Sequence, residues 1–126
     1  MKVALIQMQV ASSPAENLQT ARTHLKDAAA GGADIAVLPE MFCCPYENRC
    51  FRAYGEEAGG EVQQTLSRLA AELNLYIVGG SIPELAGENV YNTSFAYGRD
   101  GKLLARHRKA HLFDICLLYT SPSPRD

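Results

Sequence analysis

Two charged side chains in this sequence have the types and positions to do acid–base and electrostatic chemistry. Glu40 follows the apolar segment 35–38, and Lys109 closes a run of basic residues that begins at Arg106. A carboxylate at the carboxyl end of a strand suits general base catalysis, because open α/β sheets bind ligands there and burial can raise a glutamate pKa toward neutrality. A fixed ammonium group can stabilise a developing oxyanion. Each residue also has a simpler explanation, Glu40 as a solvated or helix-capping carboxylate and the basic run as a strand edge that discourages sheet pairing.

The elements that must position these side chains alternate between short β-rich segments and helical ones, which favours an α/β fold. A first helix is predicted to start at the capping box of Ser13, Pro14 and Glu16 and to stop at the left-handed Gly31-Gly32 pair. No glycine pair forms a nucleotide-binding GxGxxG pattern after a strand, so the pairs are interpreted as caps or turns. The other predicted elements are strands at 3–8, 35–38 and 75–78, the last closed by Gly79-Gly80, a helix at 62–73, an antiparallel hairpin of 90–97 and 103–108, and a loop at 41–60 that could line a pocket.

Length and composition limit the classes of partner. With 126 residues and 47% hydrophobic content, the chain can bury one ordinary core and forms no more than one domain. A formal net charge of -2 leaves no basic surplus for a phosphate backbone, so we expect a small-molecule substrate and no nucleic acid. The sequence shows no signal peptide and no membrane span, so we expect a cytoplasmic protein without membrane contact. Its cysteines lack zinc-site or disulfide-framework spacing and are Cys43, Cys44, Cys50 and Cys116.

Four segments carry a resemblance to a known family, and they are residues 38–42, 77–84, 91–94 and 108–115. In order and spacing they resemble the carbon-nitrogen hydrolase (nitrilase) superfamily. Pro45-Tyr46 and residues 111–115 look closest to its omega-amidase branch, which hydrolyses the terminal amide of 2-oxo dicarboxylic acid monoamides. The resemblance implies an α-β-β-α sandwich, of which residues 1–115 would form the N-terminal part. It also implies a homo-oligomer for the full-length form.

The family's mechanism uses a Glu-Lys-Cys triad, and Glu40 and Lys109 match its first two positions. In that mechanism the glutamate activates the cysteine, the thiolate attacks the amide carbon, ammonia leaves, and water releases the acid from the thioester. No metal or organic cofactor is implied. Because Glu40 and Lys109 both end strands on the same side, we expect them to share one pocket. Asn92 matches a family position and either holds the catalytic loop or is an ordinary strand-edge asparagine.

The family's cysteine falls downstream of the lysine motif, and this chain ends first. We therefore expect a truncated hydrolase that is inactive alone, or alternatively a non-catalytic fragment or pseudoenzyme acting by binding or oligomerisation. Cys43 and Cys44 are interpreted as packing thiols. His111 is interpreted as a hydrogen-bonded structural histidine. Residues 116–126, which begin with Cys116 and contain Ser-Pro-Ser-Pro, are expected to be a non-native, disordered tail without a catalytic role.

Overall fold

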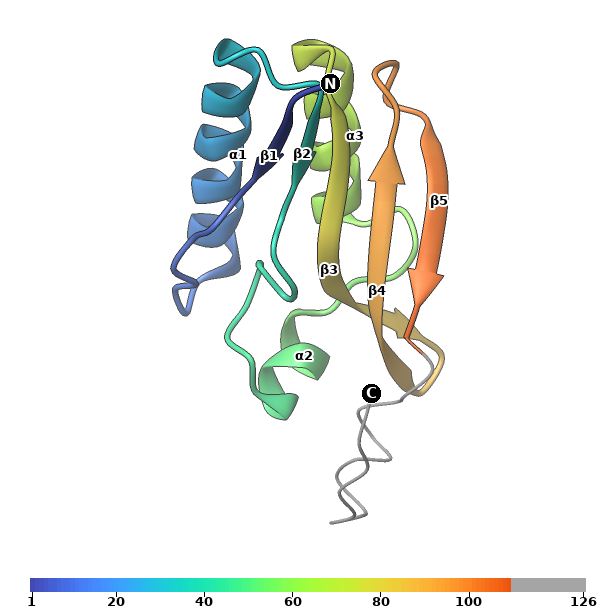
Figure 1. The fold of residues 1–126 in the computed structure, drawn as a ribbon. Coiled ribbons are helices and arrows are strands. Elements are labelled where there is room, and N and C mark those ends of the chain that lie inside the picture. Colours follow the sequence, from blue (N-terminus) through green and yellow to red (C-terminus); the bar gives the residue numbers. More distant parts are fainter. Residues whose placement is uncertain (110–126) are drawn as a thin grey trace.

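A computed structural model describes residues 1–109, which form one mixed sheet with helices packed against it (Figure 1). The predictions for His111, Cys116 and the tail at 116–126 lie outside the described residues. In the described part the strands follow one another across the sheet in chain order. The elements are β1 Val3–Leu5, α1 Pro14–Ala30, β2 Ile35–Val37, α2 Asn48–Tyr54, α3 Glu61–Leu73, β3 Tyr76–Ala86, β4 Asn89–Tyr97 and β5 Leu103–Arg108.

The sheet changes from parallel to antiparallel at β3. Strands β1, β2 and β3 run parallel and are joined through α1 and α3, whereas β3, β4 and β5 form an antiparallel meander. Two successive crossovers in the same direction place both helices on one face of the sheet, where α1 and α3 contact each other. The predicted α/β class is confirmed, and so is the hairpin of β4 and β5.

Helix α1 begins as its sequence predicts. The Ser13 hydroxyl accepts a hydrogen bond from the Glu16 amide over 3.3 Å, and Pro14 occupies the first turn. The stop differs in detail, because Gly31 has a φ of -81° and only Gly32, with a φ of 86°, is left-handed. One glycine, and not the pair, therefore supplies the conformation that ends this helix.

Several predictions about the bounds of the elements were wrong. The third strand does not stop at Gly79-Gly80 but continues to Ala86, with a register shift between Gly79 and Ile82. A bulge absorbs the glycines that were interpreted as a terminator. The segment 41–60 is not an uninterrupted loop, because it contains α2. The first two strands are also shorter than expected, ending at Leu5 and Val37.

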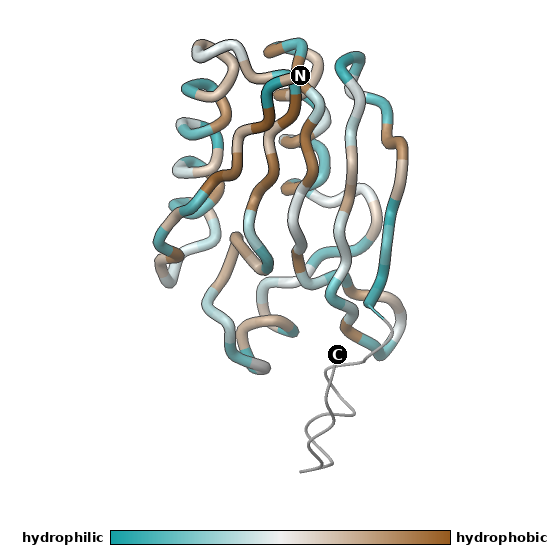
Figure 2. Tube along the Cα trace, in the orientation of Figure 1, coloured by the Kyte–Doolittle hydropathy of each residue, from teal (hydrophilic) through white to brown (hydrophobic). Residues whose placement is uncertain are grey.

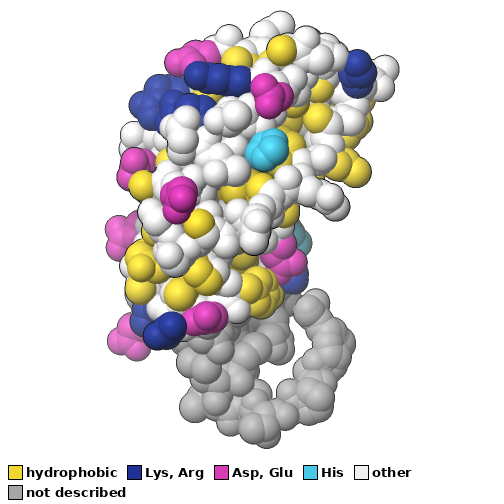
Figure 3. All heavy atoms as spheres, turned by 90° about the vertical axis from the view of Figure 1, so that its left-hand side faces the viewer, with side chains coloured by type: hydrophobic (Ala, Val, Ile, Leu, Met, Phe, Trp, Pro, Cys, Tyr) yellow, Lys and Arg dark blue, Asp and Glu magenta, His cyan; other side chains and the backbone are white. Residues whose placement is uncertain are grey.

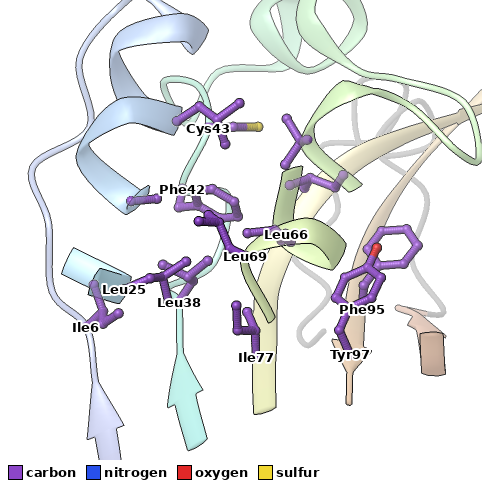
Figure 4. Packing of buried hydrophobic residues seen from close by; sticks show 14 of the residues in the cluster. Ile6, Leu25, Leu38, Phe42, Cys43, Leu66, Leu69, Ile77, Phe95 and Tyr97 are labelled. Carbon is purple, nitrogen blue, oxygen red and sulfur yellow. The ribbon is translucent and has the colours of Figure 1, made fainter. Parts of the chain in front are cut away.

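The core lies between the sheet and its two long helices (Figure 4). Leu25 of α1 and Leu66 and Leu69 of α3 pack toward Leu38 and Ile77 of the sheet, and all are buried. In Figure 2 the trace of the first three strands is coloured brown over much of its length, because most of their residues are hydrophobic. Within residues 1–109, no helix has the length and apolar character needed to cross a membrane.

The opposite face of the sheet has no helix on it in the described part of the chain. Val3 and Leu5 of β1 and Tyr76 of β3 are 50%, 76% and 39% exposed on this side. They alternate with the half-buried Ala4 and the buried Ile6 and Ile77, as the period of a strand requires. In the side view of Figure 3, hydrophobic side chains appear along the right-hand edge of the upper half. We call this surface the open face.

Candidate active site

A tight backbone turn just beyond β2 presents Glu40. The Leu38 amide still donates to the Val78 carbonyl over 2.9 Å, so pairing with β3 continues for one residue past the strand. Met41 then adopts a left-handed φ of 50°, and its amide donates to the Ser81 hydroxyl over 3.0 Å. A buried, hydrogen-bonded residue in this strained region indicates that the surrounding structure fixes the turn. Glu40 therefore leaves the sheet edge in one defined direction.

Gly80 allows the two strands to come together at this point. A Cβ at position 80 would lie 1.6 Å from the Leu38 carbonyl oxygen and 2.7 Å from the Pro39 carbonyl oxygen. Both obstacles are backbone atoms, which cannot move aside as a side chain can. The glycine thus keeps β3 close to the segment that carries Glu40.

Lys109 reaches the same place from the last described strand. Thr93 and Arg108 form the final register pair of β4 and β5, and the Lys109 amide then donates to the Asn92 carbonyl over 2.9 Å. The Lys109 Nζ atom lies 3.3 Å from Glu40 Oε2. The structure therefore brings the two predicted residues together, although 69 positions separate them in the sequence.

Two further side chains donate to the same carboxylate oxygen. Asn92 Nδ2 lies 2.7 Å from Glu40 Oε2, and the Tyr46 hydroxyl lies 3.3 Å from it. All three donors, including Lys109, converge on Oε2. Within the described residues, Oε1 accepts no hydrogen bond, and the Glu40 side chain is 43% exposed. One oxygen anchors the carboxylate while the other remains available to solvent or a ligand.

Opposing effects act on the pKa of Glu40. Partial burial raises the pKa of Glu40, but hydrogen bonds from Asn92 and Lys109, together with the Lys109 charge, outweigh it and hold the pKa below its ordinary value of 4.5. Burial alone would raise the pKa of Glu40, but the donors to its ionised form outweigh this effect. Glu40 is a carboxylate at neutral pH and can accept a proton without first losing one.

The cysteines near Glu40 belong to the core. Cys43 and Cys44 are 2% and 0% exposed and pack in the hydrophobic cluster, where Figure 4 places Cys43 beside Phe42. Interaction with the neighbouring Cys44 thiol, together with burial, raises the pKa of the Cys43 thiol far above its ordinary value. A buried, protonated thiol is a poor nucleophile. The same contact with Cys43 lowers the pKa of the Cys44 thiol, but Cys44 is fully buried. The burial of both residues agrees with the interpretation of this pair as packing thiols.

A second carboxylate near the site, Glu84, is buried on β3 and was not identified from the sequence. It is 1% exposed and pairs with Arg108, whose Nε lies 2.9 Å from Oε1, and more distantly with Arg106 at 3.4 Å. Tyr46 was also missed as a contact of Glu40. The sequence held no clear signal for Glu84, because the predicted third strand stopped before it and its arginine partners come from a strand two positions away in the sheet.

Two hollows of the described surface lie away from the side chains of Glu40 and Lys109. A cavity of about 620 Å³ lies between α3 and the β4–β5 hairpin, and neither Glu40 nor Lys109 lines it. A shallower hollow of about 510 Å³ is lined by Gln7, Met8, Gln9 and Pro39. Because Pro39 directly precedes Glu40, this second hollow lies next to the candidate site.

Comparison with known proteins gives a consistent family. The carbon-nitrogen hydrolase family matches residues 2–126. Omega-amidase NIT2 of Danio rerio is 47% identical over 114 residues, which are 90% of this chain and 41% of that protein. Its Homo sapiens counterpart is 46% identical, again over 90% of this chain and 41% of the relative. The chain thus spans about two fifths of the length of the curated relatives that it matches.

Solved structures show the same similarity. Nit3 of Saccharomyces cerevisiae, a member of branch 10 of the nitrilase superfamily, superposes with a TM-score of 0.83 and 36% identity, over 99% of this chain and 49% of that one. An amidase from Nesterenkonia sp. AN1, solved in complex with butyramide, gives a TM-score of 0.76 at 23% identity over 89% of this chain and 44% of its own, which supports the fold alone. On the family match and these similarities, the chain belongs to the carbon-nitrogen hydrolase family.

Proposed function

We propose that Glu40 and Lys109 are the general base and the cationic stabiliser of an amide-hydrolysing site, and that the complete protein acts on a small carboxamide as an omega-amidase does. The observation that carries this proposal is the contact of Lys109 Nζ with Glu40 Oε2 at one edge of the sheet. The substrate class rests on the similarity to omega-amidases of other organisms.

We propose a task for each group in the reaction. Glu40 Oε1, which has no hydrogen bond within the described residues, takes the proton from a cysteine thiol as the thiolate attacks the amide carbon. Lys109 donates a hydrogen bond to the oxyanion of the tetrahedral intermediate. The proton on Glu40 passes to the leaving nitrogen, ammonia departs, and a thioester remains. Water then gives a proton to Oε1 and its oxygen to the thioester carbon, and the acid and the thiol are released.

In this proposal the described residues supply the base and the cation. None of the three cysteines in the described part of the chain is proposed as the nucleophile. Cys43 and Cys44 are buried, and Cys50 is half-buried on α2. We therefore propose that residues 1–126 alone release no ammonia from amides. A non-catalytic role in binding or oligomerisation is the second candidate, and the observation in its favour is the open face with exposed Leu5 and Val3.

The setting of the complete protein is part of the proposal. Free thiols at Cys43, Cys44 and Cys50 suit a reducing compartment, so we propose a cytoplasmic location. We also propose a homo-oligomer with a small-molecule substrate and without a nucleic-acid or membrane partner. Cell fractionation tests the location, and light scattering on an extended protein tests the oligomer.

The experiment compares the chain with a chimera extended by the C-terminal part of a related omega-amidase. Ammonia release from 2-oxoglutaramate is measured for both, with Glu40→Gln and Lys109→Met made in the chimera. We expect no turnover by the short chain, turnover by the chimera, and a loss of about 100-fold or more in kcat for each substitution. Arg49→Gln, at an exposed ion pair with Glu47, is the matched control and should leave kcat unchanged.

Two results would contradict the proposal. A chimera that keeps its turnover after Glu40→Gln would remove Glu40 from the chemistry. Turnover by the short chain that disappears on Cys43→Ala or Cys44→Ala would show that a core cysteine acts as the nucleophile.

A further inference from the structure

Strand β5 carries the basic run and has little apolar burial to hold it in register. Every residue from Leu103 to His107 is exposed, and only Arg108 at the end is half-buried. A strand with a buried apolar face is fixed in register by that face, because a shift of one residue would turn its apolar side chains to solvent. Strand β5 lacks this constraint within the described residues. Something else must decide which basic side chain reaches Glu40.

The basic run divides between the two faces of the sheet. Arg106 pairs in register with Phe95, and both line the cavity beside α3, so they lie on the helix-covered face. Arg108 lies two residues further on and shares that face. Lys109 follows on the other face, where it meets Asn92 and Glu40. Neighbouring residues of one basic segment therefore serve two different carboxylates.

Glu84 is the carboxylate of the helix-covered face, and it selects arginine by geometry. Its two oxygens accept from Arg108 Nε at 2.9 Å and Arg108 Nη2 at 3.2 Å, which is the fork that a guanidinium offers and an ammonium does not. The Thr93 hydroxyl donates to Oε1 over 2.8 Å. The Arg108 guanidinium also lies 4.4 Å from the centre of the Tyr91 ring. These contacts occupy a carboxylate that is almost fully buried.

We propose that the Glu84–Arg108 ion pair is the register lock of the candidate site: by holding Arg108 on one face, it places Lys109 against Glu40 on the other. Glu84 is thus a positioning residue that acts through Lys109, and its role rests on the function proposed above. A shift of one residue in one direction would bring Arg108 to Glu40 and His107 to Glu84. A shift in the other direction would bring Lys109 to Glu84 and take it away from Glu40. Either shift loses the two-pronged contact of Arg108 with Glu84.

The first test measures the pKa of Glu40 by carboxyl NMR titration of residues 1–126 carrying Glu84→Gln, with Lys109→Met as reference. Direct electrostatics alone would lower the pKa of Glu40 in Glu84→Gln, because a negative charge has been removed. Displacement of Lys109 would raise it, because Glu40 loses a donor and a cation. We expect a rise, as in Lys109→Met. An unchanged or lowered pKa in a folded Glu84→Gln protein would overturn the proposal.

A second comparison tests whether the Glu84–Arg108 ion pair positions Lys109, and it does so even if Glu84→Gln does not fold. Arg108→Gln and Arg106→Gln each remove one positive charge beside Glu84, from side chains that are 36% and 43% exposed. Only Arg108 adjoins Lys109 and makes the short contact. We expect Arg108→Gln to raise the pKa of Glu40 and to speed hydrogen exchange of the Lys109 amide by about tenfold or more, with little change in Arg106→Gln. Equal changes of the Glu40 pKa and of Lys109 hydrogen exchange in the two variants would contradict the proposal.

Both measurements are made without turnover, which separates this proposal from the proposed function. An inactive chimera with the expected pKa and exchange results would refute the hydrolase and leave the lock standing. An active chimera whose kcat is unaffected by Arg108→Gln, with no change in exchange at Lys109, would refute the lock alone.

Discussion

The side-chain amide of Asn92 donates to Glu40 Oε2 over 2.7 Å, the shortest of the three contacts on that oxygen. Asn92 is 3% exposed, and its backbone carbonyl accepts from the Lys109 amide. One buried residue of β4 therefore holds the carboxylate with its side chain and the lysine with its backbone. The two candidate catalytic groups keep their separation because both are tied to the same residue.

Replacing Asn92 with alanine removes the shortest donor to the ionised form of Glu40. We expect the pKa of Glu40 to rise, since a hydrogen bond that favours the carboxylate is lost. In the chimera, kcat should fall by about tenfold or more, the scale of one hydrogen bond to a charged group. NMR titration and the acidic limb of the pH–rate profile measure the two effects. Asn89→Ala, at the start of β4, is the control, and an equal response there would mean that the effect is not specific to Asn92.

Tyr46→Phe removes a single hydroxyl from the same oxygen. That contact is longer, at 3.3 Å, and Tyr46 is 64% exposed, so solvent can replace part of what is lost. We expect the pKa of Glu40 to rise by less than in Asn92→Ala, with the acidic limb of the rate profile moving in the same direction. Tyr54→Phe on α2 provides the comparison. A larger effect from Tyr46→Phe than from Asn92→Ala would show that the ranking by distance and burial is wrong.

Stability should fall in acid through Glu84. Burial raises the pKa of Glu84, but the hydrogen bonds from Arg108 and Thr93 and the charges of Arg108 and Arg106 outweigh it, so the pKa lies below 4.5. A carboxyl group with a depressed pKa in the folded state contributes stability that is present above its unfolded pKa and lost as pH falls through its folded pKa.

Urea unfolding of residues 1–126 at pH 7, 4.5 and 3 checks this dependence. We expect Glu84→Gln to cost about 2 kcal/mol at pH 7, below the range for a fully buried pair because both arginines are partly exposed. The variant should lose less stability than the parent between pH 4.5 and pH 3. Parallel losses in the two proteins would exclude Glu84 as a source of the acid sensitivity.

The open face should make the isolated chain self-associate or bind a hydrophobic dye. Leu5 is 76% exposed there, beside Val3 and Tyr76. We expect Leu5→Ser to reduce dye binding and the associated mass in light scattering. Leu103→Ser, at a residue that lines the cavity on the opposite face and is 48% exposed, is the matched control. A monodisperse parent without dye binding would contradict the expectation.

Local sequence signals predicted the elements whose boundaries depend on local chemistry. The Ser13 cap and the Pro14 start fix α1 through contacts within four residues, and the turn at residues 98–101 fixes the hairpin in the same way. Strand β3 was cut short because Gly79-Gly80 is a stop signal when read alone. Its continuation depends on pairing with β4, a tertiary contact that local propensity does not contain.

The sequence predicted which two charged residues meet in the candidate site, but it did not predict the direction in which the pKa of Glu40 shifts. Glu40 and Lys109 end their strands, so the topology of an α/β sheet brings them to one edge. The pKa direction of Glu40 depends on Asn92 and on the distance to Lys109, which are properties of the register between β3, β4 and β5. For the same reason Glu84, an acidic residue in a strand, becomes interpretable only when Arg108 is known to lie beside it.

The left-handed turn at Met41 has a consequence for any attempt to transplant this chemistry. Copying Glu40 and Lys109 onto another sheet would reproduce two charges but not the direction in which the carboxylate leaves the backbone. That direction depends on the buried Met41, which has a φ of 50°, and on the Ser81 hydroxyl, which accepts a hydrogen bond from the Met41 amide. A glycine at position 41 would adopt the same φ without strain but would give up the buried side chain that anchors the turn in the core. A transplanted site would therefore need the ends of β2 and β5 and the part of β3 between them, with Met41 and Ser81 included beside the charged pair.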